Sequence, residues 1–470
     1  MGEDRFARYL AAFDEEPPVS LRINPRAVAT SHLSPLTSQF SPLTSQFSPL
    51  TSHLSVLNSQ FEPVPWCRHG YYLAARPNFT FDPLFHAGCY YVQEAASMFL
   101  DEVLRQHLWP RNLSTPLPGR VGQGESLLAL DLCAAPGGKS TLLRSALFED
   151  SILISNEPVR QRASILLENV QKWGYANHFV TSLYPRDIRK SLSKVFDKQS
   201  RAAGFDLILC DVPCSGEGMF RKDEATIREW SLQNVEKCWR LQREIVSDAW
   251  ACLNDGGLLI YSTCTFNTKE NEENIRWLLA EHPDAHALPV AVKSEWGITG
   301  SLLEGFTEPV YRFIPGITSS EGLFVCAIRK GREPAIVRQS PVGSDSADRP
   351  DCLSGPSVQP ERPVRATATP RPFKRTAPSV QKLPLLEPLP LHCEGPVVEL
   401  TYAQAMAFLR REALVLPADV PRGLVEVAFM GHPLGMVKNL GTRANNLYPK
   451  EWRIKSTHLP ADYEPVLRLV

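Results

Sequence analysis

Two cysteines stand where the chain could bring reactive thiols close together. Cys214 follows Asp211-Val212-Pro213 at the end of one apolar run, and Cys264 follows Ser262-Thr263 at the end of the next. If these runs are adjacent parallel strands, their carboxyl ends meet at the sheet edge where open α/β sheets bind ligands. A lone cysteine is usually a buried structural thiol. Two at neighbouring strand ends, one beside an aspartate, favour chemistry.

These residue types suit methylation of carbon 5 of a cytosine, a carbon too weakly nucleophilic to accept a methyl group unaided. A thiolate can add to carbon 6 and make carbon 5 enamine-like. Carbon 5 then attacks an electrophilic methyl group, after which the carbon-5 proton is removed and the thiolate leaves. A carboxylate such as Asp211 can hydrogen-bond N3 and the amino group of the base. One thiolate, one acid and one releasing group are needed, and all three are present.

A run of small residues follows the first predicted strand, where a helix begins. Small side chains let the backbone approach a ligand, and a helix N-terminus offers N–H groups to an anion. The run matches neither Gly-x-Gly-x-x-Gly nor a Walker loop, which disfavours a dinucleotide or a nucleoside triphosphate. A carboxylate and an adenosine would fit, so we predict a cofactor loop made of Cys133, Ala134, Ala135, Pro136, Gly137, Gly138 and Lys139.

Glu157 ends the second predicted strand, 18 residues after Lys139. A carboxylate there can accept both hydroxyl groups of a ribose, as it does in dinucleotide-binding folds. The alternative is that Glu157 merely caps the helix that begins near Pro158. Its place in the strand–helix–strand unit favours ribose binding.

Alternating strands and helices must position these residues. Short apolar runs predict buried parallel strands, and longer stretches between them predict helices, including Val159–Lys172 and Asn234–Leu253. We therefore predict a doubly wound α/β domain. The runs are Leu127–Leu132, Ile152–Ser155, Phe179–Val180, Phe205–Leu209 and Leu258–Tyr261, with closing strands at Tyr311–Phe313 and Leu323–Ile328.

The flanks of this domain differ in character. Residues 3–27 predict a short helix followed by an extended segment, and residues 31–61 carry a seven-residue repeat. A proline in three of its four units excludes a coiled coil, so we predict an inserted low-complexity loop without chemistry. Residues 331–395 hold 12 of the chain's 40 prolines and several arginines, which predicts a flexible linker. An ordered pattern resumes from about 396 to 470.

The amino-acid composition limits the classes of protein to which this chain can belong. The 470 residues are 43% apolar, enough for a substantial core, and 50 Lys and Arg balance 51 Asp and Glu. Any nucleic-acid surface must therefore come from local basic patches. The charged N-terminal residues and the absence of an apolar run of ~20 residues predict no secretory signal and no membrane span. The 11 cysteines form no Cys-x-x-Cys pair. We therefore expect no metal site, and a cytoplasmic protein.

With these motifs in view, the chain resembles the Sun-type RNA 5-methylcytosine methyltransferases, and within them the branch that modifies bacterial 16S ribosomal RNA. The resemblance covers most of the chain. It is carried by Arg22–Pro25, His86–Met98, Cys133–Lys139, Cys214–Asp223, Tyr261–Asn267 and Glu270–Glu272.

The resemblance implies a Rossmann-like methyltransferase sheet over 111–330, a small N-terminal RNA-binding lobe over 1–110 and a C-terminal RNA-binding domain over 396–470. It implies that Cys264 forms the covalent RNA adduct, that Cys214 assists release, and that Asp211 contacts the target base and borders the cofactor. The Cys133–Lys139 loop and Glu157 would bind S-adenosylmethionine. DNA cytosine methyltransferases use the Pro-Cys cysteine as nucleophile, so the second cysteine favours RNA over DNA.

The C-terminal residues resemble the RNA-binding extension of that branch. Their basic side chains could equally be a solvated face, but the resemblance favours contact with RNA phosphates. The implied partner is 16S ribosomal RNA or the small ribosomal subunit, bound by a monomer. The residues expected to touch phosphates are Lys438, Arg443, Lys450 and Arg453.

Two further features depart from the family pattern. Tyr184 holds a position near the adenine side of the cofactor where the family often has an aspartate, and Asp187 follows three residues later as a second candidate. The motif that ends the catalytic domain lacks its histidine, because Gly316 follows Arg312-Phe313-Ile314-Pro315.

Other functions stay open on the sequence alone. The enzyme could methylate transfer RNA or another ribosomal cytosine, which the catalytic residues cannot distinguish. A non-catalytic ribosome-assembly factor would be expected to lack Cys264 or Glu157, and both are present. A Rossmann oxidoreductase is disfavoured, because Gly-x-Gly-x-x-Gly is absent.

Overall fold

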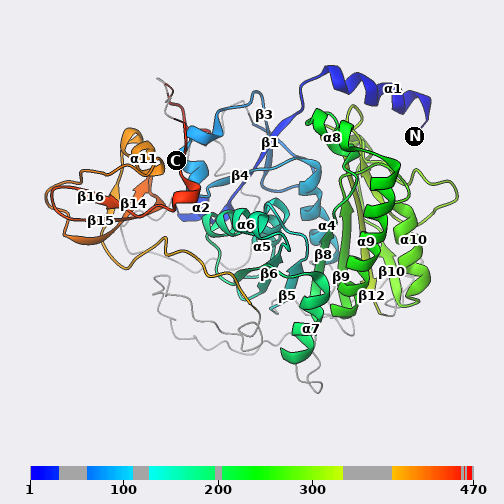
Figure 1. Cartoon of the computed structure of the whole chain (residues 1–470). Coiled ribbons are helices and arrows are strands. Elements are labelled where there is room, and N and C mark those ends of the chain that lie inside the picture. The colour runs from blue at the N-terminus through cyan, green and yellow to red at the C-terminus, as the bar shows by residue number, and fades with distance from the viewer. Residues whose placement is uncertain are drawn as a thin grey trace, which may run out of the picture.

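The computed structural model describes residues 2–30, 61–108, 126–195, 204–331, 384–456, 460 and 463–467. Within these residues the chain forms three β-sheets, in an N-terminal lobe, a central domain and a C-terminal domain (Figure 1). The predicted repeat, apart from Phe61, and the basic residues of the predicted linker lie outside the described residues.

The central sheet confirms the doubly wound α/β prediction. Strands β5 to β9 are parallel, and β12 and β10 continue the sheet in antiparallel fashion beyond β9. The order reverses between β5 and β8, and ligands bind at such a switch point. In spatial order the strands are β10 (Ala285–Leu288), β12 (Leu323–Lys330), β9 (Leu253–Thr263), β8 (Phe205–Asp211), β5 (Leu128–Asp131), β6 (Ile152–Asn156) and β7 (His178–Thr181), with β11 (Tyr311–Phe313) paired to β12.

Helices cover both faces of this sheet. On one face α4 (Leu100–His107) and α5 (Gly138–Ala146) contribute to the core, and on the other face α9 (Leu232–Cys252) does so. Helix α9 forms because Ser231 caps its N-terminus and because its buried residues recur every three or four positions. The remaining helices of this domain are α6 (Arg160–Trp173), α7 (Pro185–Val195), α8 (Glu224–Glu229) and α10 (Glu272–Glu281). In the part of the chain that the structure describes, no helix is long and apolar enough to span a membrane.

The N-terminal lobe is fixed to the central domain by a buried arginine. Arg22, on strand β1, is 2% exposed and lies 4.4 Å above the ring of Trp173. It donates hydrogen bonds to Gln93 Oε1 (2.8 Å) and Thr141 Oγ1 (2.6 Å). Because Thr141 lies on α5, the lobe is held at the start of the helix that follows the cofactor loop. The lobe comprises α1 (Glu3–Ala11), β1 (Val19–Ile23), α2 (Pro25–Thr30), β2 (Phe61–Pro63), β3 (Gly70–Leu73), α3 (Pro83–His86) and β4 (Tyr90–Val92).

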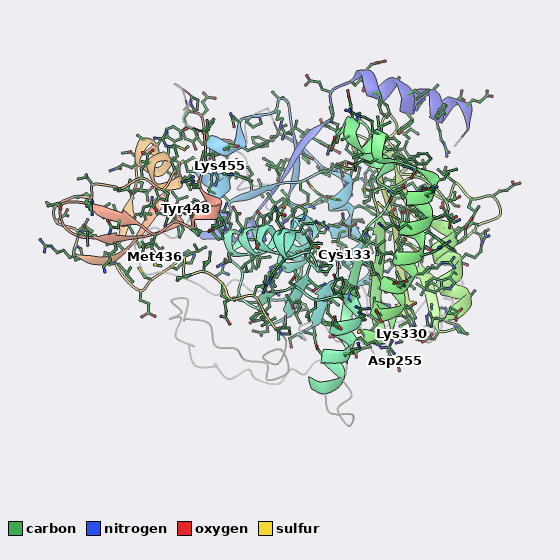
Figure 2. All side chains as sticks on the ribbon, in the orientation of Figure 1. Cys133, Asp255, Lys330, Met436, Tyr448 and Lys455 are labelled. Carbon is green, nitrogen blue, oxygen red and sulfur yellow. The ribbon has the colours of Figure 1, made fainter. Side chains whose placement is uncertain are left out.

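The C-terminal domain shares a hydrophobic core with the N-terminal lobe. Leu21, Tyr90, Phe408 and Val427 belong to one buried cluster. The Tyr402 hydroxyl donates to Phe81 O across the boundary, and Tyr448 of the C-terminal domain, labelled in Figure 2, belongs to the same cluster. The two parts therefore form one continuous body. The domain contains β13 (Val397–Glu399), α11 (Tyr402–Leu409), β14 (Gly423–Phe429), β15 (His432–Asn439) and β16 (Ala444–Asn446).

The last part of the predicted linker lies against the edge of the central sheet. The backbone N–H of Leu386 donates to Val180 O (2.8 Å), and Thr181 Oγ1 donates to Pro384 O (3.0 Å). Strand β7 ends the sheet, so its outer backbone groups would otherwise lack sheet partners. Residues 384–386 are thus ordered by pairing with this edge, which the proline content of the linker does not reveal.

Candidate active site

The two predicted cysteines meet at the carboxyl edge of the central sheet. Strands β8 and β9 pair in parallel, with Asp211 opposite Ser262. The loops that follow these strands bring Cys214 Sγ and Cys264 Sγ to 3.3 Å, within hydrogen-bond distance for sulfur. Both side chains are partly exposed, whereas Cys210, Cys252 and Cys326 are buried. The pair is therefore accessible to a substrate.

The environment distinguishes the two thiols. A hydrogen bond from Cys214 lowers the pKa of Cys264, although partial burial and the Asp211 carboxylate act in the opposite direction, and the nearby Lys139 ammonium also lowers it. The hydrogen bond to Cys264, burial and the negative charge of Glu270 raise the pKa of Cys214 well above its ordinary value. Cys264 is the better thiolate of the two, and Cys214 is the group that keeps its proton.

Asp211 links the cysteines to the cofactor loop. Its Oδ1 accepts a hydrogen bond from Ser262 Oγ (2.6 Å), and its Oδ2 pairs with Lys139 Nζ (2.9 Å). Burial disfavours the ammonium of Lys139, but the Asp211 carboxylate outweighs burial and raises the pKa of Lys139. Lys139 thus stays charged, and Asp211 stays fixed at the edge between the two predicted sites.

The predicted cofactor loop connects β5 to α5 at the switch point of the sheet. Gly137 adopts a left-handed φ of 118° as the N-cap of α5, a conformation that favours glycine. Ala134 N donates to Asn156 O, and Asn169 Nδ2 donates to Pro136 O, so both sides of the loop are held. The first amides of α5 form a site suited to an anion such as a carboxylate. The structure brings Cys133, Ala134, Ala135, Pro136, Gly137, Gly138 and Lys139 together in this turn.

Glu157 lies at the end of β6 and is 1% exposed. Its Oε1 accepts the backbone N–H of Val159 (3.0 Å), and its Oε2 lies 3.2 Å from Arg162 Nη1. The first contact is the capping role that the sequence also allowed. Two carboxylate oxygens offer more acceptor positions than these two partners use, so ribose binding is compatible with the capping contact.

The two candidates for the adenine side begin helix α7. Tyr184 is 59% exposed and precedes the helix. Asp187 lies in its first turn, with Oδ1 3.8 Å from Lys190 Nζ. Neighbouring Leu183 is tied to β6, because its N–H donates to Asn156 Oδ1. The start of α7 is therefore held beside the strand that carries Glu157.

The sequence analysis missed Asp131, which ends strand β5. Its Oδ2 accepts a hydrogen bond from Ser140 Oγ (2.6 Å). Within the described residues its Oδ1 is buried without a partner. Burial raises the pKa of Asp131 to about 7. A buried, unpaired carboxylate oxygen beside the cofactor loop suits a ligand ammonium or N–H donor. The acid two residues before the small-residue run was the available signal.

The missing histidine has a steric explanation. Gly316 has a left-handed φ of 78°, and a Cβ placed there would meet Arg8 O of α1 at 2.4 Å. Arg312 is fully buried and pairs with Glu272 of α10. The backbone of α1 thus occupies the space that a side chain at position 316 would need.

The predicted RNA-binding residues lie on the surface of the C-terminal domain. Lys438 is on β15, Arg443 is in the turn before β16, and Lys450 and Arg453 lie in and after the short helix that follows. All four side chains are exposed, as are Leu440 and Leu447 between them. They are far apart in sequence from Cys264 and form no part of the cysteine pair.

Comparison with known protein families matches three consecutive parts of the chain. Residues 1–95 match the N-terminal domain of 16S rRNA methyltransferase RsmF, residues 122–329 match 16S rRNA methyltransferase RsmB/F, and residues 396–454 match the methyltransferase RsmF PUA domain. These matches confirm the resemblance predicted from the motifs.

Individual relatives agree with these matches. Ribosomal RNA small subunit methyltransferase F of Pectobacterium atrosepticum is 33% identical over 286 residues, covering 59% of this chain and 53% of its own length. The protein of the same name from Erwinia tasmaniensis is 27% identical over 434 residues, covering 83% and 84%. The chain thus spans about half the length of the first relative. A solved methyltransferase homologue from Pyrococcus horikoshii is 25% identical, with a TM-score of 0.51, covering 70% of this chain and 91% of its own.

Proposed function

Because the chain belongs to the RsmB/F family of 16S rRNA methyltransferases, we propose that it transfers a methyl group from S-adenosylmethionine to carbon 5 of a cytosine in RNA. The observation that carries this proposal is the pair of partly exposed thiols 3.3 Å apart at the carboxyl edge of the sheet. A non-catalytic RNA-binding protein has no need to hold two partly exposed thiols in contact at the ligand-binding edge of the sheet.

The residues around the cofactor loop fit S-adenosylmethionine. The first amides of α5 suit its carboxylate, the free Oδ1 of Asp131 suits its ammonium, and Glu157 suits its ribose hydroxyls. When bound, the cofactor supplies an electrophilic methyl group. Asp211 borders this site through its contact with Lys139, and its charge acts on Cys264.

Cys264, Asp211 and Cys214 have separate roles in the proposed reaction. The Cys264 thiolate forms a bond to carbon 6 of cytosine, and the displaced electron pair activates carbon 5. Asp211 accepts a hydrogen bond from the amino group and so orients the base. After methyl transfer, carbon 5 loses its proton and the bond between carbon 6 and Cys264 Sγ breaks. Cys214 assists this second stage by passing its proton to the departing Cys264 sulfur, 3.3 Å away. The Cys214 thiolate formed in this way is a strong base, because the pKa of its thiol is raised, and it accepts the proton from carbon 5.

The proposed substrate is 16S ribosomal RNA or the small subunit, bound by the lobe over 1–110 and the domain over 396–470. Methylation assays with purified protein should compare naked 16S rRNA, small subunits and transfer RNA, read by bisulfite sequencing. One new methylated cytosine in 16S rRNA is the expected result. Methylation of transfer RNA alone would change the substrate, and no methylation of any RNA by a folded, cofactor-binding protein would overturn the proposal.

Cofactor binding predicts a thermal shift. S-adenosylmethionine at a hundred times its Kd should stabilise the folded protein by about 2.7 kcal/mol, because it binds only the folded state. Glu157→Gln should weaken binding roughly tenfold or more by removing a charged acceptor. Glu102→Gln, which alters a buried carboxylate of α4, should lower the melting temperature without changing the shift. A shift with NADH or ATP but none with S-adenosylmethionine would contradict the assignment.

Phosphate contacts predict a change in salt dependence. Replacing Lys438, Arg443, Lys450 and Arg453 together by Gln should weaken RNA binding and flatten the plot of log K against log salt by about one per lost contact. Lys190→Gln with Lys293→Gln provides a control, since both lysines are well exposed on the central domain. Equal slopes for the two variants would mean that the four C-terminal residues form a solvated face and do not contact RNA phosphates.

A further inference from the structure

Two carboxylates, the fully buried Glu270 and the partly buried Glu217, link the cysteine loops, and neither was assigned a role by the sequence analysis. Glu217 lies three residues after Cys214, and Glu270 lies six residues after Cys264. Each carboxylate accepts hydrogen bonds from the backbone of the other cysteine's loop. The arrangement is therefore reciprocal.

Glu217 reaches from the Cys214 loop to the Cys264 loop. Its Oε2 accepts the backbone N–H groups of Phe266 and Asn267, both at 2.8 Å. Its Oε1 accepts Trp230 Nε1 (3.0 Å), which fixes the carboxylate from the side of α8. In the same direction Gly218 N donates to Cys264 O at 2.7 Å. The turn that follows Cys264 is thus held by the chain that follows Cys214.

Glu270 reaches the opposite way. It is fully buried, and its Oε2 accepts the backbone N–H of Ser215 (3.1 Å), directly after Cys214. The same oxygen accepts Gln242 Nε2 (2.6 Å), whose amide also donates to Pro213 O (2.8 Å). The residues on both sides of Cys214 are therefore anchored by Glu270 or by its partner on α9.

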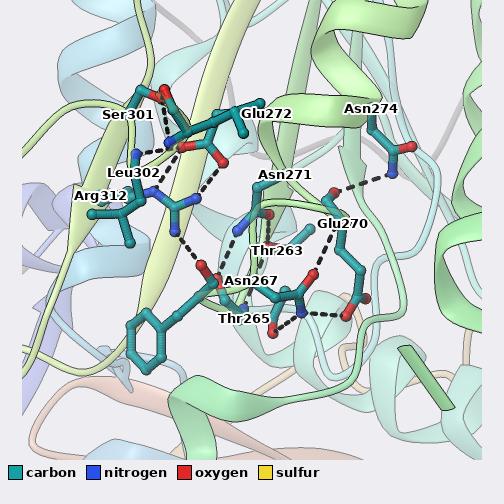
Figure 3. Close-up of polar contacts among 12 residues, drawn as sticks. Thr263, Thr265, Asn267, Glu270, Asn271, Glu272, Asn274, Ser301, Leu302 and Arg312 are labelled. Carbon is teal, nitrogen blue, oxygen red and sulfur yellow. Dashed lines mark hydrogen bonds and ion pairs between the residues drawn. The ribbon is translucent and has the colours of Figure 1, made fainter. Parts of the chain in front are cut away.

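Asn267 joins the two carboxylates. Its Nδ2 lies 2.7 Å from Glu270 Oε1 and 3.2 Å from Glu217 Oε1, and its Oδ1 accepts Glu270 N (2.9 Å). Figure 3 shows Asn267 between Thr265 and Glu270 on the loop after β9. A hydrogen bond between Ser215 Oγ and Thr265 Oγ1 (3.0 Å) also links the two loops. The network spans both loops at the residues next to the thiols.

The free-energy cost of burying charge in this network indicates that the network has a function. Burying the carboxylate of Glu270 is expensive unless its charge is compensated, and the donors described around Glu270 and the partly buried Glu217 are neutral N–H groups. Apolar residues could pack two loops together more simply. Carboxylates instead accept several N–H groups at fixed directions, and so set the relative position of two backbones.

We infer that Glu217, Glu270 and Asn267 are positioning residues, a loop brace that holds the Cys214 and Cys264 sulfurs in contact. This role rests on the proposed function, since it concerns the thiols of that reaction. The brace acts through the backbone and touches neither sulfur directly. It makes the hydrogen bond from Cys214 to Cys264 a permanent feature of the site.

The first test measures thiol reactivity without RNA or cofactor. Iodoacetamide labelling followed by peptide mass spectrometry gives the rate at Cys264 as a function of pH. In Glu270→Gln and Glu217→Gln an amide N–H₂ replaces one acceptor oxygen, so the loops should part and the hydrogen bond to Cys264 weaken. The midpoint of the Cys264 labelling profile should then move to higher pH, because that hydrogen bond lowers the pKa of Cys264. Thr265→Val offers a milder version, since it removes the hydroxyl contact with Ser215 and one acceptor of Asn267 Nδ2 but keeps both carboxylates.

The second test separates positioning from binding. The brace variants should lose roughly a hundredfold in kcat, the effect of misplacing a reacting group by about 1 Å, with KM for the cofactor and Kd for RNA within about threefold of wild type. Asp101→Asn is the control: Asp101 is a buried carboxylate that pairs with Arg68 in the N-terminal lobe. It should lose stability and keep the labelling midpoint of Cys264.

The labelling result decides the inference. An unchanged midpoint in folded Glu270→Gln, Glu217→Gln and Thr265→Val would overturn it, as would a loss confined to KM. Failure of the proposed function would look different: wild-type protein would methylate no RNA, and the labelling midpoint would still respond to the brace.

Discussion

Cys214→Ala is expected to accumulate a covalent protein–RNA complex that survives denaturing electrophoresis, and Cys264→Ala is expected to form none. Without Cys264 no bond to carbon 6 can form, so methylation should fall by on the order of 10⁴-fold or more. Without Cys214, attack and methyl transfer remain feasible, but release of the methylated product is blocked. The double variant should behave like Cys264→Ala, a strongly non-additive result.

The structure adds a pH dependence to this prediction. The hydrogen bond from Cys214 lowers the pKa of Cys264, so Cys214→Ala should raise it. The thiolate fraction of Cys264 at neutral pH then falls, and the complex should form slowly. Raising the pH should restore the rate, because a group with a higher pKa regains its thiolate only at higher pH. Time courses at pH 7 and pH 9, with incorporation of labelled RNA into the protein band, measure this effect.

A buried thiol provides the control for that experiment. Cys210 lies on β8 and is fully buried, with a pKa raised by burial. Cys210→Ala should form no stable complex and should change activity only through stability. A complex trapped by Cys264→Ala but not by Cys214→Ala would reverse the roles of the two thiols. Full activity in both variants would make both structural.

The sequence could predict the cysteine pair because its determinants are local. Apolar runs identify β8 and β9, and parallel pairing then brings their ends, and hence Cys214 and Cys264, to one edge. The cofactor loop follows from the same rule, since it lies directly after β5. The helices predicted at Val159–Lys172 and Asn234–Leu253 are confirmed within two residues, as α6 and α9.

Contacts between residues far apart in the chain leave no local pattern in the sequence from which they could be predicted. Glu217 accepts N–H groups 49 and 50 residues away, and such a separation has no periodicity to detect. The C-terminal domain was predicted as a separate unit beyond a linker. It shares its core with strands of the N-terminal lobe, since Leu21 and Phe408 belong to one buried cluster. Spacing along the chain shows which faces need a partner but not which partner they find.

The largest effect on stability is expected at Arg312. Its side chain is fully buried and pairs with fully buried Glu272 at the first turn of α10. Arg312 Nη1 also donates to Phe266 O (2.8 Å), and Glu272 Oε1 accepts Leu302 N (2.9 Å) (Figure 3). The pair therefore joins β11, α10 and the loop that follows Cys264.

Arg312→Met should lower the free energy of unfolding by about 3–5 kcal/mol, because it leaves the Glu272 carboxylate buried without a compensating charge. The double variant Arg312→Met with Glu272→Met should recover much of this loss, since apolar residues of similar size often replace a buried ion pair without loss. The exposed pair of Lys293 and Glu295 is the matched control, and its loss should cost below about 1 kcal/mol. Urea denaturation of the four proteins gives these differences.

Measuring activity beside stability separates the role of the ion pair in folding from its role in positioning the Cys264 loop. The double variant regains the packing but not the donor to Phe266 O, two residues after the proposed nucleophile. If Arg312 serves stability alone, the double variant should methylate RNA at the wild-type rate wherever it is folded. We expect instead that its kcat stays low although its unfolding free energy recovers, because the Cys264 loop has lost one of its fixed backbone contacts. A double variant as unstable as Arg312→Met would contradict the uncompensated-charge argument itself.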